Sequence, residues 1–181
     1  MKKLLFVFLW LSAYSYVQAQ AGETLVKVGQ KMPEFRVKMF DGSVIDSQDL
    51  KGKVVLLNFW ATWCPPCRQE LARVQKDIID RFKGKDFVFL PVSRQDSYEK
   101  IEAFRKQTGY RFPMGMDTDR KIYSLFATAT IPRNFLIDRD GKIILAEQGY
   151  SEESFQKLIE AIERVLVWQM RIAVIYSLYP W

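Results

Sequence analysis

NFWATWCPPCRQE, the sequence of residues 58–70, contains both cysteines of the chain, Cys64 and Cys67. Two residues three positions apart lie on one face of a helix, with Cβ atoms roughly 5–6 Å apart. A disulfide needs Cα atoms about 4.4–6.8 Å apart, so this pair can close and reopen without a large backbone movement. A ring this small stabilises a fold by only about 2 kcal/mol in the chain-entropy model. The spacing favours electron exchange, with a structural disulfide or a pair of buried thiols as the alternative.

Zinc binding and haem attachment are two other uses of closely spaced cysteines. A structural zinc site takes four ligands, and because the chain has two cysteines and no histidine, only carboxylates could complete one. Haem attachment requires a histidine directly after the second cysteine, where this chain has Arg68. We therefore expect the site to hold neither a metal ion nor a cofactor.

The two cysteines follow an apolar run, VVLLNFW (54–60), which is typical of a strand covered on both faces. If a helix begins near Cys64, its unpaired N–H groups and its dipole favour an anion there, and such sites lower the pKa of a cysteine to roughly 3.5–7.5. We expect Cys64 to be the attacking thiolate and Cys67, one turn inside the helix, to resolve the mixed disulfide. Pro65 and Pro66 fix the backbone of the first turn, where missing N–H groups cost little.

The remaining chain alternates between strand-like and helix-like patterns. The expected elements are a strand at 34–40 that turns at Asp41-Gly42, a helix from Cys64 to Phe82, a strand at 86–92, a helix from Asp96 or Ser97 to Gly109, a hairpin at 134–149 and a final helix from Ser151. This order predicts an α/β fold in which helices flank a central mixed β-sheet, with an N-terminal β-hairpin.

The N-terminus, MKKLLFVFLWLSAYSYVQAQ, has two lysines followed by a short apolar core and small residues at Val17 and Ala19. This pattern predicts a signal peptide over 1–19 with cleavage after Ala19. The apolar core is short beside the roughly 20 residues of a membrane span, although a retained anchor is the alternative. Export would place the protein in the periplasm or another extracytoplasmic compartment, where disulfides persist.

Residues 26–166 form the predicted domain, and an apolar tail of unknown role follows at 167–181. The tail is too short, and too interrupted by Arg171, for a confident membrane span. It could pack as a terminal helix, dock a partner, lie on a membrane or reflect a reading-frame error. Without residues 1–19 the chain carries 25 basic and 21 acidic residues, a net charge of +4. Because these charges are mixed along the chain, we expect no nucleic-acid partner.

The segment VVLLNFWATWCPPCRQEL (54–71) resembles the active site of TlpA/ResA-like thiol-disulfide oxidoreductases. The resemblance extends from about Val28 to Leu166 and includes VGQKMPEFRVKMFDGSVIDSQDLKGK (28–53) and TATIPRNFLIDRDGKI (128–143). It implies a thioredoxin-like fold and an exported enzyme that reduces disulfides of extracytoplasmic proteins, with electrons from a membrane thiol donor. A disulfide oxidase or isomerase of the same fold and a non-catalytic binding module are the alternatives.

The resemblance also assigns roles to single residues. Pro132 matches the cis-proline that faces the cysteines in this family, and with Ile131 it would shape the groove for a substrate chain. Trp63, Pro65 and Pro66 would line the other side of that groove. Simple core packing of Trp63 and an ordinary trans proline at position 132 are the alternatives.

Glu70 matches an acid of the ResA-like group and would accept the proton of Cys67 from beneath it. A solvent-facing glutamate on the helix is the alternative. Asn58 stands where thioredoxin has a buried aspartate and cannot accept a proton, which leaves Glu70 as the acid nearest in sequence to the resolving thiol. Peroxiredoxins place a threonine where this chain has Ala61, so a peroxidase is not expected.

The segment around Pro132 departs from the haem-maturation members of the family. Those members carry a glycine-rich stretch and an acid there, whereas this chain has Ala129, Thr130, Arg133 and Asn134. A role in cytochrome c maturation is therefore not carried over from the resemblance.

Overall fold

The computed structural model describes residues 23–178, so the predicted signal peptide at 1–19 lies outside the described part of the chain. Seven strands form one mixed sheet in the order β2-β1-β5-β4-β3-β6-β7. Strand β3 pairs in parallel with β4 and antiparallel with β6. The strands are β1 (Arg36–Met39), β2 (Val44–Asp46), β3 (Val54–Trp60), β4 (Phe87–Arg94), β5 (Gly115–Asp117), β6 (Arg133–Ile137) and β7 (Ile143–Gln148). The predicted mixed sheet and N-terminal hairpin are confirmed.

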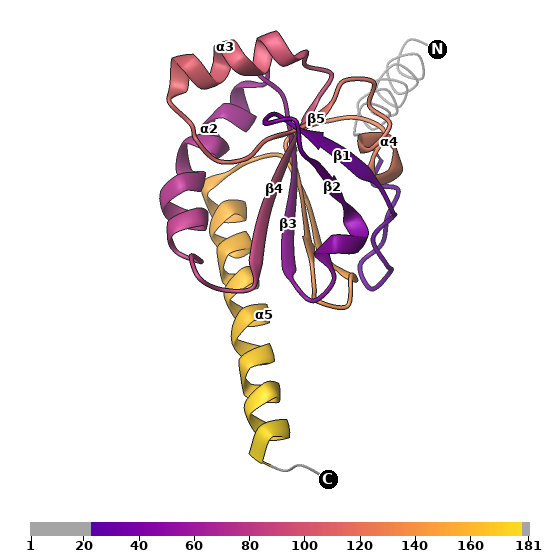
Figure 1. Ribbon diagram of the computed structural model, residues 1–181, viewed down its shortest axis with the longest axis vertical. Coiled ribbons are helices and arrows are strands. Elements are labelled where there is room, and N and C mark those ends of the chain that lie inside the picture. Colours follow the sequence, from indigo (N-terminus) through magenta and orange to yellow (C-terminus); the bar gives the residue numbers. More distant parts are fainter. Residues whose placement is uncertain (1–22, 179–181) are drawn as a thin grey trace, which may run out of the picture.

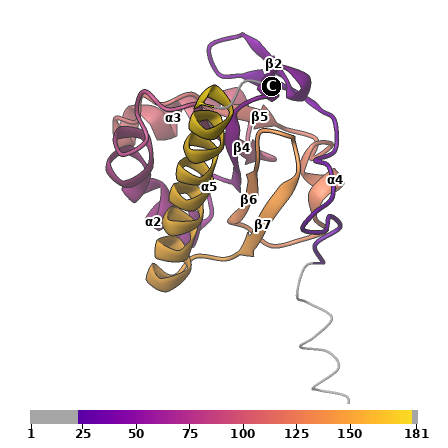
Figure 2. The same ribbon diagram turned by 90° about the horizontal axis from the view of Figure 1, so that it is seen from below.

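Helices cover both faces of the sheet. One face carries α2 (Pro65–Val74), α3 (Tyr98–Thr108) and α5 (Glu152–Leu178), whereas α4 (Tyr123–Phe126) lies on the other (Figures 1 and 2). A short η1 (Ser47–Leu50) follows the N-terminal hairpin, and the π-helical segment η2 (Gln75–Asp80) continues α2. This arrangement buries both faces of the central strands, as a continuous apolar strand requires.

The core lies around β3 and β6, in which every residue is buried. On the α4 side, the ring of Phe59 packs 5.4 Å from that of Phe126 and 6.1 Å from that of Phe135, measured between ring centres. Tyr123 meets Phe59 edge to face at 5.2 Å. Aromatic pairs at such separations stabilise beyond their buried area, so this cluster fixes α4 and the segment after it against the sheet.

The sequence did not predict β5 and α4. These elements have three and four residues, which is too short for a hydrophobic periodicity to be recognised. The helix expected from Cys64 begins at Pro65, with Cys64 as its N-cap. The final helix runs to Leu178, so its backbone continues into the tail at 167–181, and Figure 1 shows this half of α5 extending below the sheet. Among the described residues, no helix is long and apolar enough to cross a membrane.

Gly115 is expected to tolerate no side chain. A Cβ atom at this position in β5 would lie 2.7 Å from a methyl group of Val37 and 3.2 Å from one of Val92. Both neighbours are fully buried, stiff β-branched residues, so the sheet would have to shift. We expect Gly115→Ala to destabilise the fold by about 1–3 kcal/mol. Urea denaturation would measure this, and an unchanged midpoint would contradict the packing at β5.

Candidate active site

The two cysteines form a disulfide at the start of α2, with a Cα–Cα separation of 5.3 Å. β3 ends at Trp60, and residues 61–63 lead to Cys64. Pro65 and Pro66 occupy the first helical positions and Cys67 lies on the buried face of α2. Cys64 is 4% exposed and Cys67 is fully buried, so Cys64 is the more accessible of the two cysteines.

The helix N-terminus supplies one hydrogen-bond donor to Cys64. Because Pro65 and Pro66 have no N–H group, the first donor available in α2 is the N–H of Cys67, which lies 3.3 Å from the Cys64 Sγ. In the reduced protein this N–H and the helix dipole stabilise a negative charge on that sulfur. The geometry supports the expected role of Cys64 as the nucleophile.

The loop that leads into β6 faces the disulfide. Its Ile131–Pro132 peptide bond is cis, so the trans alternative does not hold. The carbonyl oxygen of Ile131 lies 3.7 Å from the Cys64 Sγ, a contact that has no S–H donor while the disulfide is closed. Tyr123 fixes this loop, because its hydroxyl lies 2.5 Å from the carbonyl oxygen of Ala129 and 2.7 Å from that of Thr130.

The residues expected to line the groove differ in exposure. Trp63 is 53% exposed, so it is not a core residue. Pro65 is exposed and Pro66 is half-buried, whereas Ile131 and Pro132 are both buried. The structure thus brings the Ile131 carbonyl, which belongs to the cis peptide bond, against Cys64 and leaves Trp63 at the surface.

Glu70 is 2% exposed, so the alternative of a solvent-facing glutamate is wrong. Its carboxylate accepts a hydrogen bond of 2.5 Å from the Asn134 side chain and one of 3.3 Å from the Asn58 side chain. Burial raises the pKa of Glu70 to about 7, against the opposing effect of these two hydrogen bonds. At neutral pH the group can therefore both take up and release a proton.

Asn134 is a site residue whose link to Glu70 the sequence did not predict. It pairs across the sheet with Asn58, and the Asn58 amide donates to the Asn134 side-chain oxygen over 2.9 Å. β3 and β6 each carry a single asparagine within an otherwise mostly apolar run. Buried amides need partners, so these two asparagines were the signal that could have revealed the contact.

Asp96 is a second residue that the sequence does not connect to the site, because its position indicates only a possible N-cap of the helix that follows. The cap of α3 is Ser97, whereas Asp96 is fully buried. Its carboxylate accepts from the N–H of Thr62 at 2.7 Å, from the Thr62 hydroxyl at 2.8 Å and from the Ser93 hydroxyl at 2.6 Å. These bonds hold the segment that leads from β3 to Cys64.

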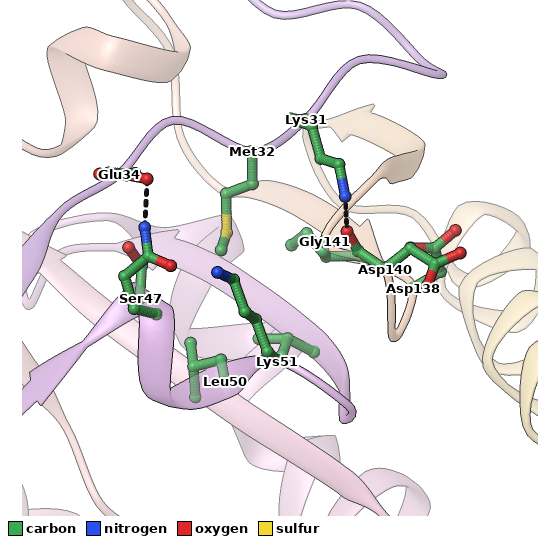
Figure 3. A pocket seen from close by; sticks show the side chains of 12 residues that line it. Lys31, Met32, Glu34, Ser47, Leu50, Lys51, Asp138, Asp140 and Gly141 are labelled. Carbon is green, nitrogen blue, oxygen red and sulfur yellow. Dashed lines mark hydrogen bonds between the residues drawn. The ribbon is translucent and has the colours of Figure 1, made fainter.

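A pocket of about 300 Å³ lies away from the disulfide, at the end of the sheet where β3 begins with Val54 and Val55. Figure 3 shows two hydrogen bonds between residues of its lining: Lys31 donates to the carbonyl oxygen of Asp140, and Gln48 donates to Glu34. The pocket is not part of the redox site. Within residues 23–178, no three Cys, Asp or Glu side chains gather as a metal site.

The stability of the fold is expected to fall as the pH rises from about 4.5 to about 7, because of Glu70. The native state holds the proton up to about pH 7, whereas the unfolded chain releases it near the ordinary value of 4.5, so the native state binds more protons in this interval. A rise from 4.5 to about 7 corresponds to a loss of about 3 kcal/mol. Urea denaturation at both ends of the interval should show that Glu70→Gln removes this loss. An equal stability difference between variant and wild type at both pH values would contradict the prediction.

A thioredoxin-like fold with a Cys-X-X-Cys disulfide at a helix N-terminus, facing a cis-proline, defines a thiol-disulfide oxidoreductase of the thioredoxin-like class. Comparison with known proteins agrees with this class.

The chain belongs to the AhpC/TSA family, whose model matches residues 28–146. Relatives include the thiol-disulfide oxidoreductase ResA of Bacillus thuringiensis, with 31% identity over 80% of this chain and 82% of the relative. ResA of Bacillus subtilis is 34% identical over 74% of each chain. These matches confirm the predicted similarity to the ResA-like group and the predicted enzyme class, a thiol-disulfide oxidoreductase.

Solved structures agree with the thioredoxin-like fold. A Bacteroides thetaiotaomicron protein, described as a candidate protein disulfide isomerase, superposes with a TM-score of 0.75 and 38% identity, over 79% of this chain and 92% of its own. A thioredoxin-family thiol:disulfide interchange protein from Chlorobium tepidum superposes with a TM-score of 0.65 and 25% identity, over 78% and 98%. The thioredoxin-like fold expected from the resemblance is confirmed.

Proposed function

We propose that this protein reduces disulfide bonds in other exported proteins by means of the Cys64–Cys67 couple. The observation that carries the proposal is the placement of the Cys64 sulfur, which caps α2, lies 3.3 Å from the Cys67 N–H and faces the carbonyl oxygen of Ile131. A sulfur held in this way is a ready thiolate nucleophile once reduced. The relatives named thiol-disulfide oxidoreductase ResA support the same chemistry.

In the first step, the Cys64 thiolate attacks one sulfur of the client disulfide. The client S–S bond breaks, a mixed disulfide forms between Cys64 and the client, and the other client sulfur leaves as a thiolate. The carbonyl of the cis Ile131–Pro132 peptide bond lies against Cys64, so the client segment that carries the attacked sulfur would lie along this loop. Trp63 and Pro65, exposed beside Cys64, would form the opposite wall.

In the second step, Cys67 loses its proton and attacks the Cys64 sulfur. The mixed disulfide breaks, the Cys64–Cys67 disulfide forms and the second client sulfur leaves as a thiolate, so two electrons have passed to the client. Glu70, one turn after Cys67 and buried on the same helix, is proposed to accept the Cys67 proton. Its raised pKa of about 7 suits a base that works at neutral pH.

A continuing cycle needs a donor that returns two electrons and two protons to the disulfide. A membrane-bound dithiol protein is the proposed donor, because reduction outside the cytoplasm lacks the thiol pool of the cytosol. The relative described as a candidate disulfide isomerase favours one alternative, in which the reduced protein rearranges client disulfides without a net transfer.

Reduction of insulin and the reduction potential of the couple together test the proposal. We expect catalysed insulin reduction and a potential below about −230 mV, in the range of reductants such as thioredoxin. A potential near the values of about −180 to −120 mV found for isomerases and oxidases would instead assign one of those roles. Absence of any exchange by the intact Cys64–Cys67 pair would leave a non-catalytic binding module.

Export is the second part of the proposal, and it rests on the signal-like sequence of residues 1–19. Expression of the full chain in a bacterium with a periplasm should yield a mature protein that begins at or near Gln20. Mass spectrometry of the periplasmic and membrane fractions would measure this. Recovery of the chain with Met1 intact in the membrane fraction would contradict cleavage and indicate a retained anchor.

A further inference from the structure

Arg94 stands between the two segments that flank the disulfide. It is the last residue of β4, at the end of the sheet where β3 leads to the cysteines. Its guanidinium carbon lies 5.6 Å from the centre of the Trp63 ring and 4.8 Å from that of the Tyr123 ring. Trp63 directly precedes Cys64, and Tyr123 fixes the carbonyl groups before Ile131. Two aromatic faces therefore hold this cation beside the redox site.

The charge of Arg94 has no acidic partner within residues 23–178, where its side chain forms neither an ion pair nor a hydrogen bond. Its Nε is buried and donates to no acceptor. Asp96, two residues further on, is occupied by hydrogen bonds from Thr62 and Ser93. The Arg94 side chain as a whole is only half-buried, so an acceptor from outside the chain can reach its guanidinium and supply the partner that the described chain does not.

A second arginine raises the local positive charge. The guanidinium carbon of Arg120 lies 5.4 Å from the centre of the same Tyr123 ring, and its Nη2 donates to the carbonyl oxygen of Thr128. Arg120 likewise forms no ion pair in the described chain. Asp117, the nearby acid, is buried and accepts from the backbone N–H groups of Ile122 and Tyr123. Two like charges at one ring repel each other, and a bound anion would relieve that repulsion.

From these contacts we infer that Arg94, with Arg120 beside it, binds a carboxylate of the client protein close to the client's disulfide. The inference rests on the proposed function, because a client must approach Cys64 past Trp63 for the contact to form. A planar guanidinium held by two rings presents its N–H groups in the geometry that a carboxylate accepts. Arg94 is thus a specificity-determining residue that favours clients with aspartate or glutamate beside the reactive cysteine.

Three disulfide-linked peptides test the inference, identical except that glutamate, glutamine or lysine flanks each cysteine. The rate constant for their reduction by the reduced protein is measured by stopped flow at about 50 mM and about 500 mM salt. We expect the glutamate peptide to react about tenfold faster than the glutamine peptide at low salt, and the lysine peptide to be slowest. Higher salt should shrink these ratios. Arg94→Gln should lower the glutamate-to-glutamine ratio about fivefold, and Arg94→Lys should retain part of it.

Arg139→Gln is the matched control. Arg139 forms an ion pair with Asp86, which directly precedes the first residue of β4, whereas Arg94 is the last residue of that strand. This variant should leave the ratio at its wild-type value. Equal rate constants for the three peptides in the wild type would overturn the inference. An equal loss on the glutamate and glutamine peptides in Arg94→Gln would also overturn it, since Arg94 would then act only on the shape of the site. Failure of the wild type to reduce the glutamine peptide would contradict the proposed function instead.

Discussion

Cys67→Ser is expected to convert the protein into a trap for its clients. Cys64 keeps its place at the N-cap of α2, so it still attacks a client disulfide, but no thiol remains to resolve the intermediate. Turnover should fall by at least about 10³-fold, since the second nucleophile is absent. Non-reducing electrophoresis with mass spectrometry should find mixed disulfides through Cys64 in near-stoichiometric amount.

Cys64→Ser is the matched control for the trapping experiment. In this variant the remaining thiol is the fully buried Cys67, so neither turnover nor adducts are expected. Stable adducts through Cys67, with little adduct in Cys67→Ser, would reverse the assignment of the two thiols. Equal activity of both variants and the wild type would remove the couple from the mechanism altogether.

Glu70→Gln is expected to separate the two steps of the reaction. Attack by Cys64 should change little, because the N–H of Cys67 supports that sulfur independently of Glu70. Resolution should slow by roughly 10²–10⁴-fold, the usual contribution of a general base. A buried thiol ionises poorly, and the two asparagines beside Glu70 offer no carboxylate to replace it. Rapid quenching of a single turnover would count the mixed disulfide as it accumulates.

The pH profile distinguishes a base from a merely structural residue at position 70. The wild-type rate of resolution should rise with pH to a plateau, with an apparent pKa of about 7, because only ionised Glu70 accepts a proton. Glu70→Gln should lose this step. Glu153→Gln is the control, since that exposed glutamate pairs with Lys157 on α5. Unchanged resolution by Glu70→Gln between pH 6 and 8 would remove the carboxylate from the proton transfer.

Glu70 and Asn134 show how far the sequence could define the site. The turn spacing placed Glu70 near Cys67, but the same spacing allowed a surface position, because a helix alone does not say which face its neighbours cover. The packing of α2 against the sheet buries the carboxylate. Asn134 lies 64 residues from Glu70, and only the antiparallel pairing of β3 with β6 brings the two side chains together.

The sequence by itself determined the features that depend on neighbours along the chain. The Cys-X-X-Cys spacing after an apolar strand placed a disulfide at a helix N-terminus, and the hydrophobic periods located the long strands and helices. Only the tertiary structure decided which side chains meet across the sheet. The anchoring of Thr62 by Asp96, the burial of Glu70 between two asparagines and the position of Arg94 between Trp63 and Tyr123 are of this kind. Such contacts arise from strand order and register, and no local period in the chain encodes them.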